Sequence, residues 1–367
     1  MDDDEELIPS LPNDLALECL IRLPFYCFTA ASKVSKSWKT KINLPEFRQN
    51  RKLSGSARFL MVLAQAWSPS FDKSYVKSWT PPIYRLTMYD PQSNNWSDLP
   101  PLPWFPSGLP MICRIVVAGS DLVVLGGCDP VTWRVCNSVF IYNFISGDWR
   151  IGSDMPGHQR LFFACASDSE NMIYVAGGHD EDKRALKTAM AYDVENDKWV
   201  QIDDMARERD ECRGVFRHGR FHVIGGYCTE RQGEFEMDME CFNVLTGKWE
   251  DVEDNFLDES VCPERCVGDC DVDGRMYIFG KKNLLIDDNN NNETGGRGWK
   301  ILAGFPDDVS SVSYATTWQG KRLMIGYDEQ SRAHNVYTMD VGENKWTRMD
   351  SPLFYTGPAQ SICSFYL

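Results

Sequence analysis

The chain has 367 residues, of which 43% are hydrophobic, so it can bury a sizeable core, and extended disorder is excluded. Its formal net charge of −15 argues against a nucleic-acid partner, because phosphate recognition normally requires clustered lysine and arginine. The acidic tail at residues 1–10 lacks a basic leader, and no long apolar span follows it, so we expect no membrane partner and a cytoplasmic or nuclear location.

Residues 11–54 have the pattern of a small all-α module. Asn13 or Asp14 can cap a first helix, which Pro24 ends, and its apolar residues Leu17, Leu20 and Ile21 share one face. A second helix is expected to carry an apolar stripe formed by Ala30, Val34, Trp38 and Ile42. Residues 21–58 hold nine basic residues against one acid, which suits an acidic partner and equally a solvated charged face.

The remaining chain, residues 55–367, is organised around a repeat of about 50 residues. Tryptophan recurs at nearly equal intervals, at positions 96, 149, 199, 249, 299 and 346. Except before Trp299, a large apolar or aromatic residue lies seven positions earlier: Tyr89, Tyr142, Tyr192, Phe242 and Met339. Short runs rich in Val, Ile, Phe and Tyr precede these pairs and end in glycine, as in residues 121–127, 171–178 and 220–226. Such runs are typical of strands, and each unit is expected to contain about four.

The two ends of the repeat region are expected to meet. Residues 58–63 have the pattern of the second strand of the first unit, with Ala64 and Gln65 where other units have glycine, and no strand precedes them. Residues 358–367 follow the last tryptophan and have the pattern of a first strand. Because an open ring exposes edge strands, we expect this C-terminal segment to complete the first unit and close a ring of about six units.

A strand-rich unit with a glycine pair and a later Tyr and Trp resembles the kelch repeat, whose family fold is a propeller of four-stranded blades. The resemblance implies an all-β six-bladed kelch β-propeller preceded by the small all-α module. In kelch propellers, the loops from fourth to first strands and from second to third strands share one face, which usually docks partners. We therefore predict a substrate-binding ring of arginines with two apolar anchors: Trp104, Phe105, Arg114, Arg160, Arg209, Arg213 and Arg265. Pairing of each arginine with a nearby carboxylate is an equally open alternative.

The module resembles the F-box, whose pattern has two Leu-Pro pairs and a Val and a Trp four residues apart. Ser35 and Lys36 replace the usual Cys-Arg. The resemblance implies that the module binds a Skp-type adaptor, which links it to cullin and RING subunits. We expect this interface to comprise Leu11, Pro12, Leu15, Leu20, Leu23, Pro24, Val34 and Trp38. A helical cap that only packs on the propeller is the alternative.

Four segments, among them residues 7–24 and 205–216, also resemble a plant kelch F-box group that recruits phenylalanine ammonia-lyase for ubiquitination. Related proteins recruit chalcone synthase or other phenylpropanoid and flavonoid enzymes. The resemblance implies a non-catalytic, substrate-recruiting subunit of a Skp-cullin-F-box ubiquitin ligase, which delivers a protein substrate to degradation. A kelch scaffold outside any ligase and a propeller enzyme are the alternatives.

Motifs of a catalytic site are absent from the sequence, which has no G-x-S-x-G, P-loop or HExxH pattern. Cys262, Cys266 and Cys270 have a metal-like spacing, but zinc sites usually pair their ligands more closely and add a fourth. We expect these residues to be buried thiols, and we expect no metal, cofactor or enzyme activity. The 13 cysteines are scattered along a chain without an export signal, which favours free thiols over disulfides.

Overall fold

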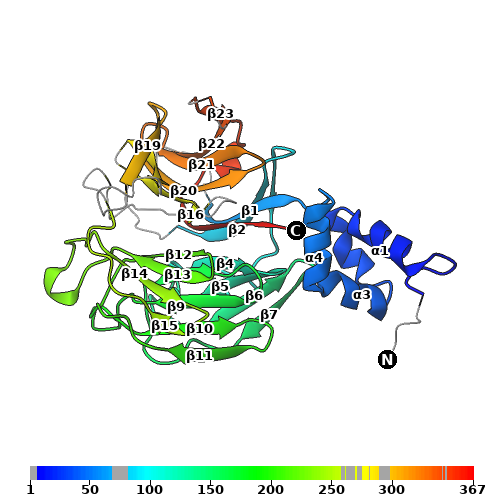
Figure 1. The fold of residues 1–367 in the computed structure, drawn as a ribbon, viewed down its shortest axis with the longest axis horizontal. Coiled ribbons are helices and arrows are strands. Elements are labelled where there is room, and N and C mark those ends of the chain that lie inside the picture. Colours follow the sequence, from blue (N-terminus) through cyan, green and yellow to red (C-terminus); the bar gives the residue numbers. More distant parts are fainter. Residues whose placement is uncertain are drawn as a thin grey trace.

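The computed structural model (Figure 1) describes residues 6–67, 82–257, 261, 269–270, 275–280, 282–288, 298–340, 342–343 and 345–367. In these residues the chain forms a small helical module followed by six four-stranded antiparallel sheets. The sheets are the blades of one β-propeller, which confirms the predicted fold class.

The helical module contains four α-helices and one 3₁₀-helix: α1 (Asn13–Ile21), η1 (Phe25–Cys27), α2 (Phe28–Ala31), α3 (Lys36–Asn43) and α4 (Pro45–Leu53). Pro12, and neither Asn13 nor Asp14, is the residue before the first turn of α1, and the Asn13 side chain instead accepts a hydrogen bond from the Leu7 amide at 2.9 Å. The expected second helix is divided, because Ser35 is extended and caps α3 by accepting the Trp38 amide at 3.0 Å. The predicted apolar stripe is therefore wrong: Val34 lies in an exposed turn, and Ile42 is fully buried.

Each blade is named here by its order in the ring, with its innermost strand first. Blade 1 contains β24 (Ala359–Tyr366), β1 (Phe59–Ala66), β2 (Tyr84–Asp90) and β3 (Asn95–Asp98). Blade 2 contains β4 (Arg114–Ala118), β5 (Asp121–Leu125), β6 (Val139–Asn143) and β7 (Asp148–Gly152). Blade 3 contains β8 (Ala164–Ser167), β9 (Met172–Ala176), β10 (Ala189–Asp193) and β11 (Lys198–Ile202).

The other three blades follow the same order. Blade 4 contains β12 (Arg213–Arg217), β13 (Arg220–Ile224), β14 (Met239–Asn243) and β15 (Lys248–Trp249). Blade 5 contains β16 (Asp269–Cys270), β17 (Met276–Phe279), β18 (Asn283–Asp288) and β19 (Gly298–Gly304). Blade 6 contains β20 (Ser311–Trp318), β21 (Lys321–Asp328), β22 (Ala333–Asp340) and β23 (Thr347–Met349).

The repeated tryptophans connect neighbouring blades. In blade 3, Trp199 lies opposite Tyr192 on the adjacent strand, with ring centroids 4.8 Å apart. Its indole N–H donates to the carbonyl of Ser153, in the segment that leaves blade 2, at 2.8 Å. The same hydrogen bond to the preceding blade recurs at Trp149, Trp249, Trp299 and Trp346. Each of these tryptophans therefore packs within its own blade and also fixes the blade before it.

The ring is closed by the last strand of the chain. β24 pairs antiparallel with β1, with Phe59 opposite Tyr366 and Leu63 opposite Ile362 (red beside blue in Figure 1). Gln65 occupies the place of the usual glycine and is fully buried. Its amide donates to the carbonyls of Tyr355 and Gly357 at 2.7 and 2.9 Å, so this side chain anchors the segment that leads into β24.

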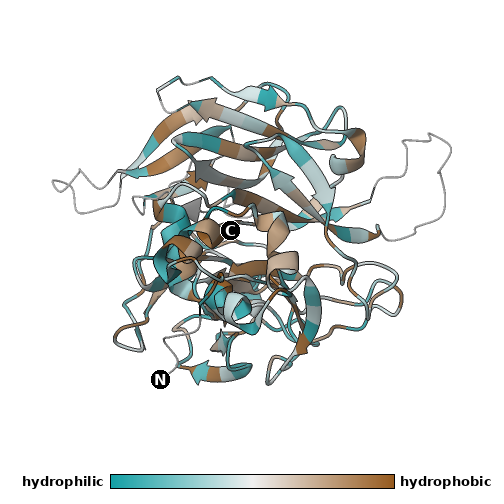
Figure 2. Ribbon diagram, turned by 90° about the vertical axis from the view of Figure 1, so that its right-hand side faces the viewer, coloured by the Kyte–Doolittle hydropathy of each residue, from teal (hydrophilic) through white to brown (hydrophobic). Residues whose placement is uncertain are grey.

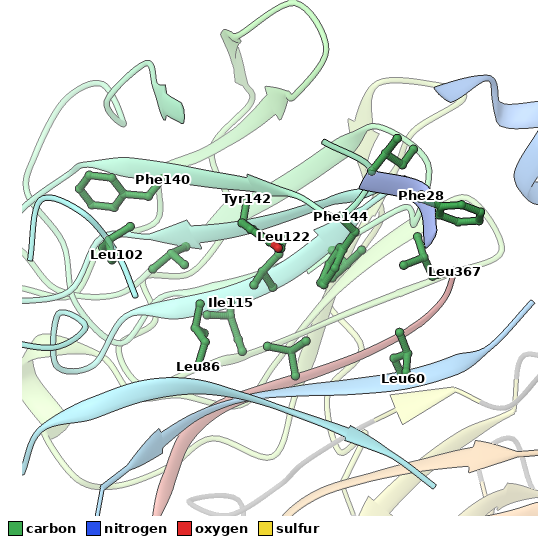
Figure 3. Close-up of a cluster of buried hydrophobic side chains, with 14 of the residues drawn as sticks. Phe28, Leu60, Leu86, Leu102, Ile115, Leu122, Phe140, Tyr142, Phe144 and Leu367 are labelled. Carbon is green, nitrogen blue, oxygen red and sulfur yellow. The ribbon is translucent and has the colours of Figure 1, made fainter. Parts of the chain in front are cut away.

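The module and the propeller share one hydrophobic core (Figure 3). Leu20, Phe28 and Phe47 of the module belong to the same buried cluster as Phe144 of blade 2 and the C-terminal Leu367. Figure 2 looks onto the module, whose helices lie in front of the propeller strands. The hydrophobic effect therefore fixes the module at one end of the ring.

Candidate protein-docking surfaces

The helical module exposes several large apolar side chains on its outer side. Leu15, Tyr26 and Val34 are 52%, 74% and 63% exposed, and they come from α1, η1 and the turn before α3. Pro12 and Pro24 are exposed as well. So many exposed apolar groups on a small module are typical of an interface with another protein. We call these five residues the apolar module surface.

The other residues expected at this interface lie deeper in the module. Leu20 is only 1% exposed and packs in the shared core, which corrects the expectation that it contacts a partner. Leu11, Leu23 and Trp38 are half-buried, and the Trp38 indole N–H donates to the Leu7 carbonyl at 2.6 Å. Tyr26 is not among the residues that the sequence predicts for this interface, although two aromatic residues follow Pro24 directly and Tyr26 is the second of them.

Arg51 of α4 holds the module, the linker and the C-terminus together. Its guanidinium is 1% exposed and donates to the carbonyls of Ile21 and Leu23 in the module, and to that of Ser56 in the linker at 2.8 Å. It also donates to the C-terminal Leu367 carbonyl at 3.4 Å. Burial lowers the pKa of Arg51 to about 10, so the side chain stays charged at neutral pH.

The module covers one face of the propeller. Thr29 lies against Gly147 in the turn between β6 and β7, and Arg48 pairs with Glu170 in the turn between β8 and β9 at 3.1 Å. The opposite ends of the strands carry the other set of loops. Here the isolated bridges Met111–Cys128, Leu161–His179 and Asp210–Tyr227 join each fourth-to-first loop to the second-to-third loop of the same blade. The two kinds of loop therefore share one face, as predicted, and we call it the docking face.

Exposed apolar residues gather on one sector of the docking face. They lie in loops of blades 1 and 2 and in the segment that enters β24: Trp67, Ile83, Trp104, Val131, Trp133, Leu353 and Phe354. The predicted anchors belong to this sector. Trp104 is 44% exposed and stacks on Phe140 with centroids 5.6 Å apart, whereas Phe105 is half-buried and packs edge-on against the same ring at 5.4 Å.

The predicted arginine ring divides into two groups. Arg160 and Arg209 are each 1% exposed and donate to the glycine-pair carbonyls of their own blades, Gly177 and Gly225, at 3.1 and 2.8 Å. Arg209 also pairs with Glu240 at 3.0 Å. These contacts correct the expectation that Arg160 and Arg209 meet a substrate, because they hold the ends of blade strands.

Arg114 and Arg213 lie in the central channel, on its docking-face side, and line a cavity of about 420 Å³ between the inner strands. A second cavity of about 480 Å³ continues the channel towards the module, where Arg48 and Lys52 of α4 line it. The two cavities therefore extend from the docking-face side of the inner strands to α4 of the module. Arg265 lies outside the described residues, as do Cys262, Cys266 and the side chain of Cys270, so their predicted roles stay predictions.

One group of side chains in the described part of the chain has ligand atoms close enough for a metal. Atoms of Glu208, Cys228 and Glu230 lie within 4.8 Å of one another. Glu208 already accepts the Thr229 amide at 2.7 Å, and Glu230 is exposed. Three such ligands near the surface do not form the closed four-ligand set of a structural zinc site. Within the described residues, no helix is both long and apolar enough to cross a membrane.

Comparison with known proteins gives matches to both parts of the chain. Residues 8–50 match the F-box domain, and residues 78–281 match the family described as the KLHDC2/KLHL20/DRC7 Kelch-repeats domain. The F-box/kelch-repeat proteins At1g80440 and At1g15670 of Arabidopsis thaliana are 39% and 40% identical to this chain, each over 98% of this chain and 99% of its own length. A solved structure titled "Structure of YjhT" covers 72% of this chain and 91% of its own with a TM-score of 0.55, and at 13% identity it supports the fold alone.

Proposed function

Because this chain belongs to the plant F-box/kelch-repeat proteins, we propose that it is the substrate receptor of a Skp-cullin-F-box ubiquitin ligase. In this proposal, the apolar module surface binds a Skp-type adaptor, which brings cullin and RING subunits. The docking face binds the protein that becomes ubiquitinated. The chain itself is a non-catalytic subunit, and we propose that it works in the cytoplasm, the nucleus or both.

One observation supports this proposal: the exposed apolar residues of the module and the loops of the docking face belong to a single packed unit. The apolar module surface consists of solvent-exposed side chains, and the docking face lies at the ends of the blade strands opposite to those that the module covers. The shared core and Arg51 connect them. A receptor needs this arrangement, because it must hold a substrate at a fixed position relative to the rest of the ligase.

The substrate that we propose is phenylalanine ammonia-lyase, with chalcone synthase or another phenylpropanoid or flavonoid enzyme as the next choice. The support for this choice is the resemblance of four segments to the plant group that recruits these enzymes. Fold alone does not select among relatives, because propellers of the same architecture bind different proteins. Ubiquitination assays with each of these enzymes as a separate substrate would distinguish among them.

The test is reconstitution of the ligase with purified subunits. We expect the full chain to co-purify with a Skp-type adaptor and to direct ubiquitin onto phenylalanine ammonia-lyase. The double variant Leu15→Asp/Val34→Asp places charge on the apolar module surface and should weaken adaptor binding by more than about tenfold, which is about 1.4 kcal/mol. The control is Leu245→Asp, since Leu245 is 94% exposed on blade 4 and lies outside the module.

Two outcomes would contradict the proposal. Wild-type protein that does not bind a Skp-type adaptor would mean that the module is only a helical cap on a kelch scaffold, and adaptor binding that survives Leu15→Asp/Val34→Asp would place the adaptor away from the apolar module surface. Turnover of a small molecule by the purified chain without other subunits would favour a propeller enzyme. Ubiquitination of chalcone synthase but not of phenylalanine ammonia-lyase would keep the ligase role and change the substrate.

A further inference from the structure

The loops of the docking face are divided by charge. Those of blades 3 and 4, residues 177–188, 203–212 and 225–238, hold 12 acidic residues against six basic ones. The loop from blade 1 to blade 2, residues 99–113, holds no charged residue and carries the exposed Trp104. The docking face therefore has an acidic part, formed by the three loops of blades 3 and 4, beside its apolar sector on blades 1 and 2.

Several carboxylates of the acidic part lack a cationic partner. Glu181, Glu230 and Glu234 are exposed, and none of them forms an ion pair with a described residue. Glu208 and Glu230, together with Cys228, have ligand atoms within 4.8 Å of one another. Two carboxylates at such a distance repel each other, and a cation between them removes the repulsion. The acidic part therefore suits lysine or arginine side chains of another molecule.

The helical module carries the opposite charge beside its own exposed apolar residues. Lys33, Lys36, Lys39 and Lys41 are exposed, and none of them forms an ion pair with a described residue. Lys33 directly precedes Val34 of the apolar module surface. Lys36 lies in the first turn of α3, which holds no acidic residue, although the helix dipole disfavours a cation at that end. The module thus combines apolar side chains with four unpaired cations, which we call the lysine cluster.

The module and the docking face of one molecule cannot meet each other. The shared core fixes the module at the strand ends opposite the docking face, where Thr29 lies against Gly147. An inner strand such as β4 has five residues and is about 17 Å long, so it keeps the two surfaces apart. A contact between them therefore requires two molecules. A symmetric contact between two modules is disfavoured, because it would bring two lysine clusters together.

We propose that this chain, in the absence of an adaptor, associates head to tail with a second copy of itself. The lysine cluster of one copy faces the acidic part of the docking face of the next copy. Exposed apolar side chains of both surfaces are removed from water beside this charged contact. Because the two surfaces differ, the contact is heterologous, and further copies can add at both ends of the assembly.

One consequence of this contact rests on the proposed receptor function. The adaptor and the next copy both use the apolar module surface, so they compete for it. A chain without an adaptor covers the docking face of its neighbour. Adaptor binding to every copy exposes all docking faces, so that substrates gain access to receptors that are already connected to the ligase.

The first experiment is sedimentation equilibrium of the purified full chain without other subunits. We expect a molar mass that rises with protein concentration beyond that of a dimer. Lys36→Glu/Lys39→Glu and Glu230→Lys/Glu234→Lys each reverse the charge of one surface, and each should weaken association at least about tenfold. All four residues are exposed, and circular dichroism checks that both variants fold. Wild-type protein that stays monomeric would overturn the proposal.

Charge restoration tests whether the two surfaces contact each other. A chain with all four substitutions has an acidic module and a basic docking-face patch, so it should associate about as strongly as the wild type. The matched control is Lys198→Glu/Lys248→Glu, which changes exposed lysines on the outer strands of blades 3 and 4 and should leave association unchanged. A monomeric four-substitution chain would overturn the assignment of these surfaces, as would loss of association in the control.

Addition of a Skp-type adaptor separates this contact from the receptor function. We expect the adaptor to convert the assemblies into one-to-one complexes, because it covers the apolar module surface. Assemblies that persist with the adaptor bound would overturn the shared use of that surface. Wild-type protein that binds the adaptor but never self-associates would reject the head-to-tail contact and keep the receptor function. Self-association without any adaptor binding would keep the contact and reject the receptor function.

Discussion

At the scale of single residues, the position of an arginine relative to an inner strand decides its role. Arg114 and Arg213 are the first residues of β4 and β12, and their side chains line the channel. Arg160 and Arg209 come before their inner strands, and their side chains turn into the blades to meet glycine carbonyls. The same residue type near the same loops therefore either holds blade strands or lines the central channel.

The buried side chain of His334 in β22 predicts that the stability of the protein depends on pH. Its side chain is 7% exposed, and its Nδ1 atom accepts the Ala359 amide at 3.2 Å. Burial lowers the pKa of His334 from 6.5 to about 4. Protonation is therefore easier in the unfolded chain, so the stability that the neutral ring contributes is complete above pH 6.5 and is lost as the pH falls towards 4. Because of His334, we expect the free energy of unfolding to be about 2 kcal/mol lower at pH 5 than at pH 7.

The measurement is urea unfolding of the wild type and of His334→Asn at both pH values. An asparagine amide oxygen can accept the Ala359 amide in place of Nδ1 but cannot titrate. The variant should lose about 2 kcal/mol less than the wild type between pH 7 and pH 5, whatever the substitution costs at neutral pH. Equal losses in the two proteins would show that His334 does not carry this pH dependence.

Sequence spacing could predict the ring but not the orientation of these side chains. The tryptophan interval and a cross-strand aromatic partner such as Tyr192 are set by strand geometry, which is the same in blades 1 to 4. Burial of Leu20, Arg160 and Arg209 depends on contacts between distant segments, such as α1 with the propeller core. A local pattern contains no information on those contacts, so it does not reveal that Leu20, Arg160 and Arg209 are buried.

At the scale of elements, the division of the second module helix follows from one side chain. The Ser35 hydroxyl accepts the Trp38 amide and caps α3, and Ser35 itself is extended. Ala30 and Ile42 therefore lie in different helices. The break has a functional effect, because it places Val34 in a turn with 63% of its surface exposed. In a continuous helix, Val34 would lie on the same face as the buried Ile42.

At the element scale, we predict that the propeller cannot fold without the closing strand β24. Deletion of residues 358–367 removes all hydrogen-bond partners on the inner edge of β1 and the buried Leu367 from the shared core. We expect no soluble folded protein. The free energy lost with these contacts exceeds the free energy of unfolding of a typical domain, which is about 5–15 kcal/mol. Solubility and circular dichroism after refolding are the measurements.

Addition of the missing strand in trans provides the control. A synthetic peptide of residues 358–367 should restore soluble protein when it is present during refolding, because it can pair with β1 as β24 does. Truncated protein that is soluble and melts like the wild type would contradict the role of this strand in closing the ring.

At the scale of the whole molecule, the module and the propeller should unfold as one unit. Phe28, Phe47 and Leu367 lie in one cluster, and Arg51 donates hydrogen bonds to both parts. Trp38 is the only tryptophan of the module, whereas Trp199 lies in blade 3. In protein labelled with 5-fluorotryptophan, the ¹⁹F signals of these two residues should disappear at the same urea concentration.

A variant in the shared core should separate the unfolding of the module from that of the propeller. Phe28→Ala removes a fully buried ring between the two parts and should cost about 3–5 kcal/mol at that contact. The Trp38 signal should then be lost at lower urea than the Trp199 signal. Loss of the Trp38 signal before that of Trp199 in the wild type would contradict a common core.

The position of β24 also has a consequence for synthesis of the protein on the ribosome. The module is made before the propeller, yet its core includes Leu367, which is made after the other 23 described strands, and β1 lacks its inner neighbour until β24 is made. At about 5–20 residues per second, translation leaves this core incomplete for tens of seconds. An unfinished chain therefore cannot hold its module in the final orientation. Under the proposed function, a chain without β24 would therefore be unable to hold a docked protein at a fixed position relative to an adaptor.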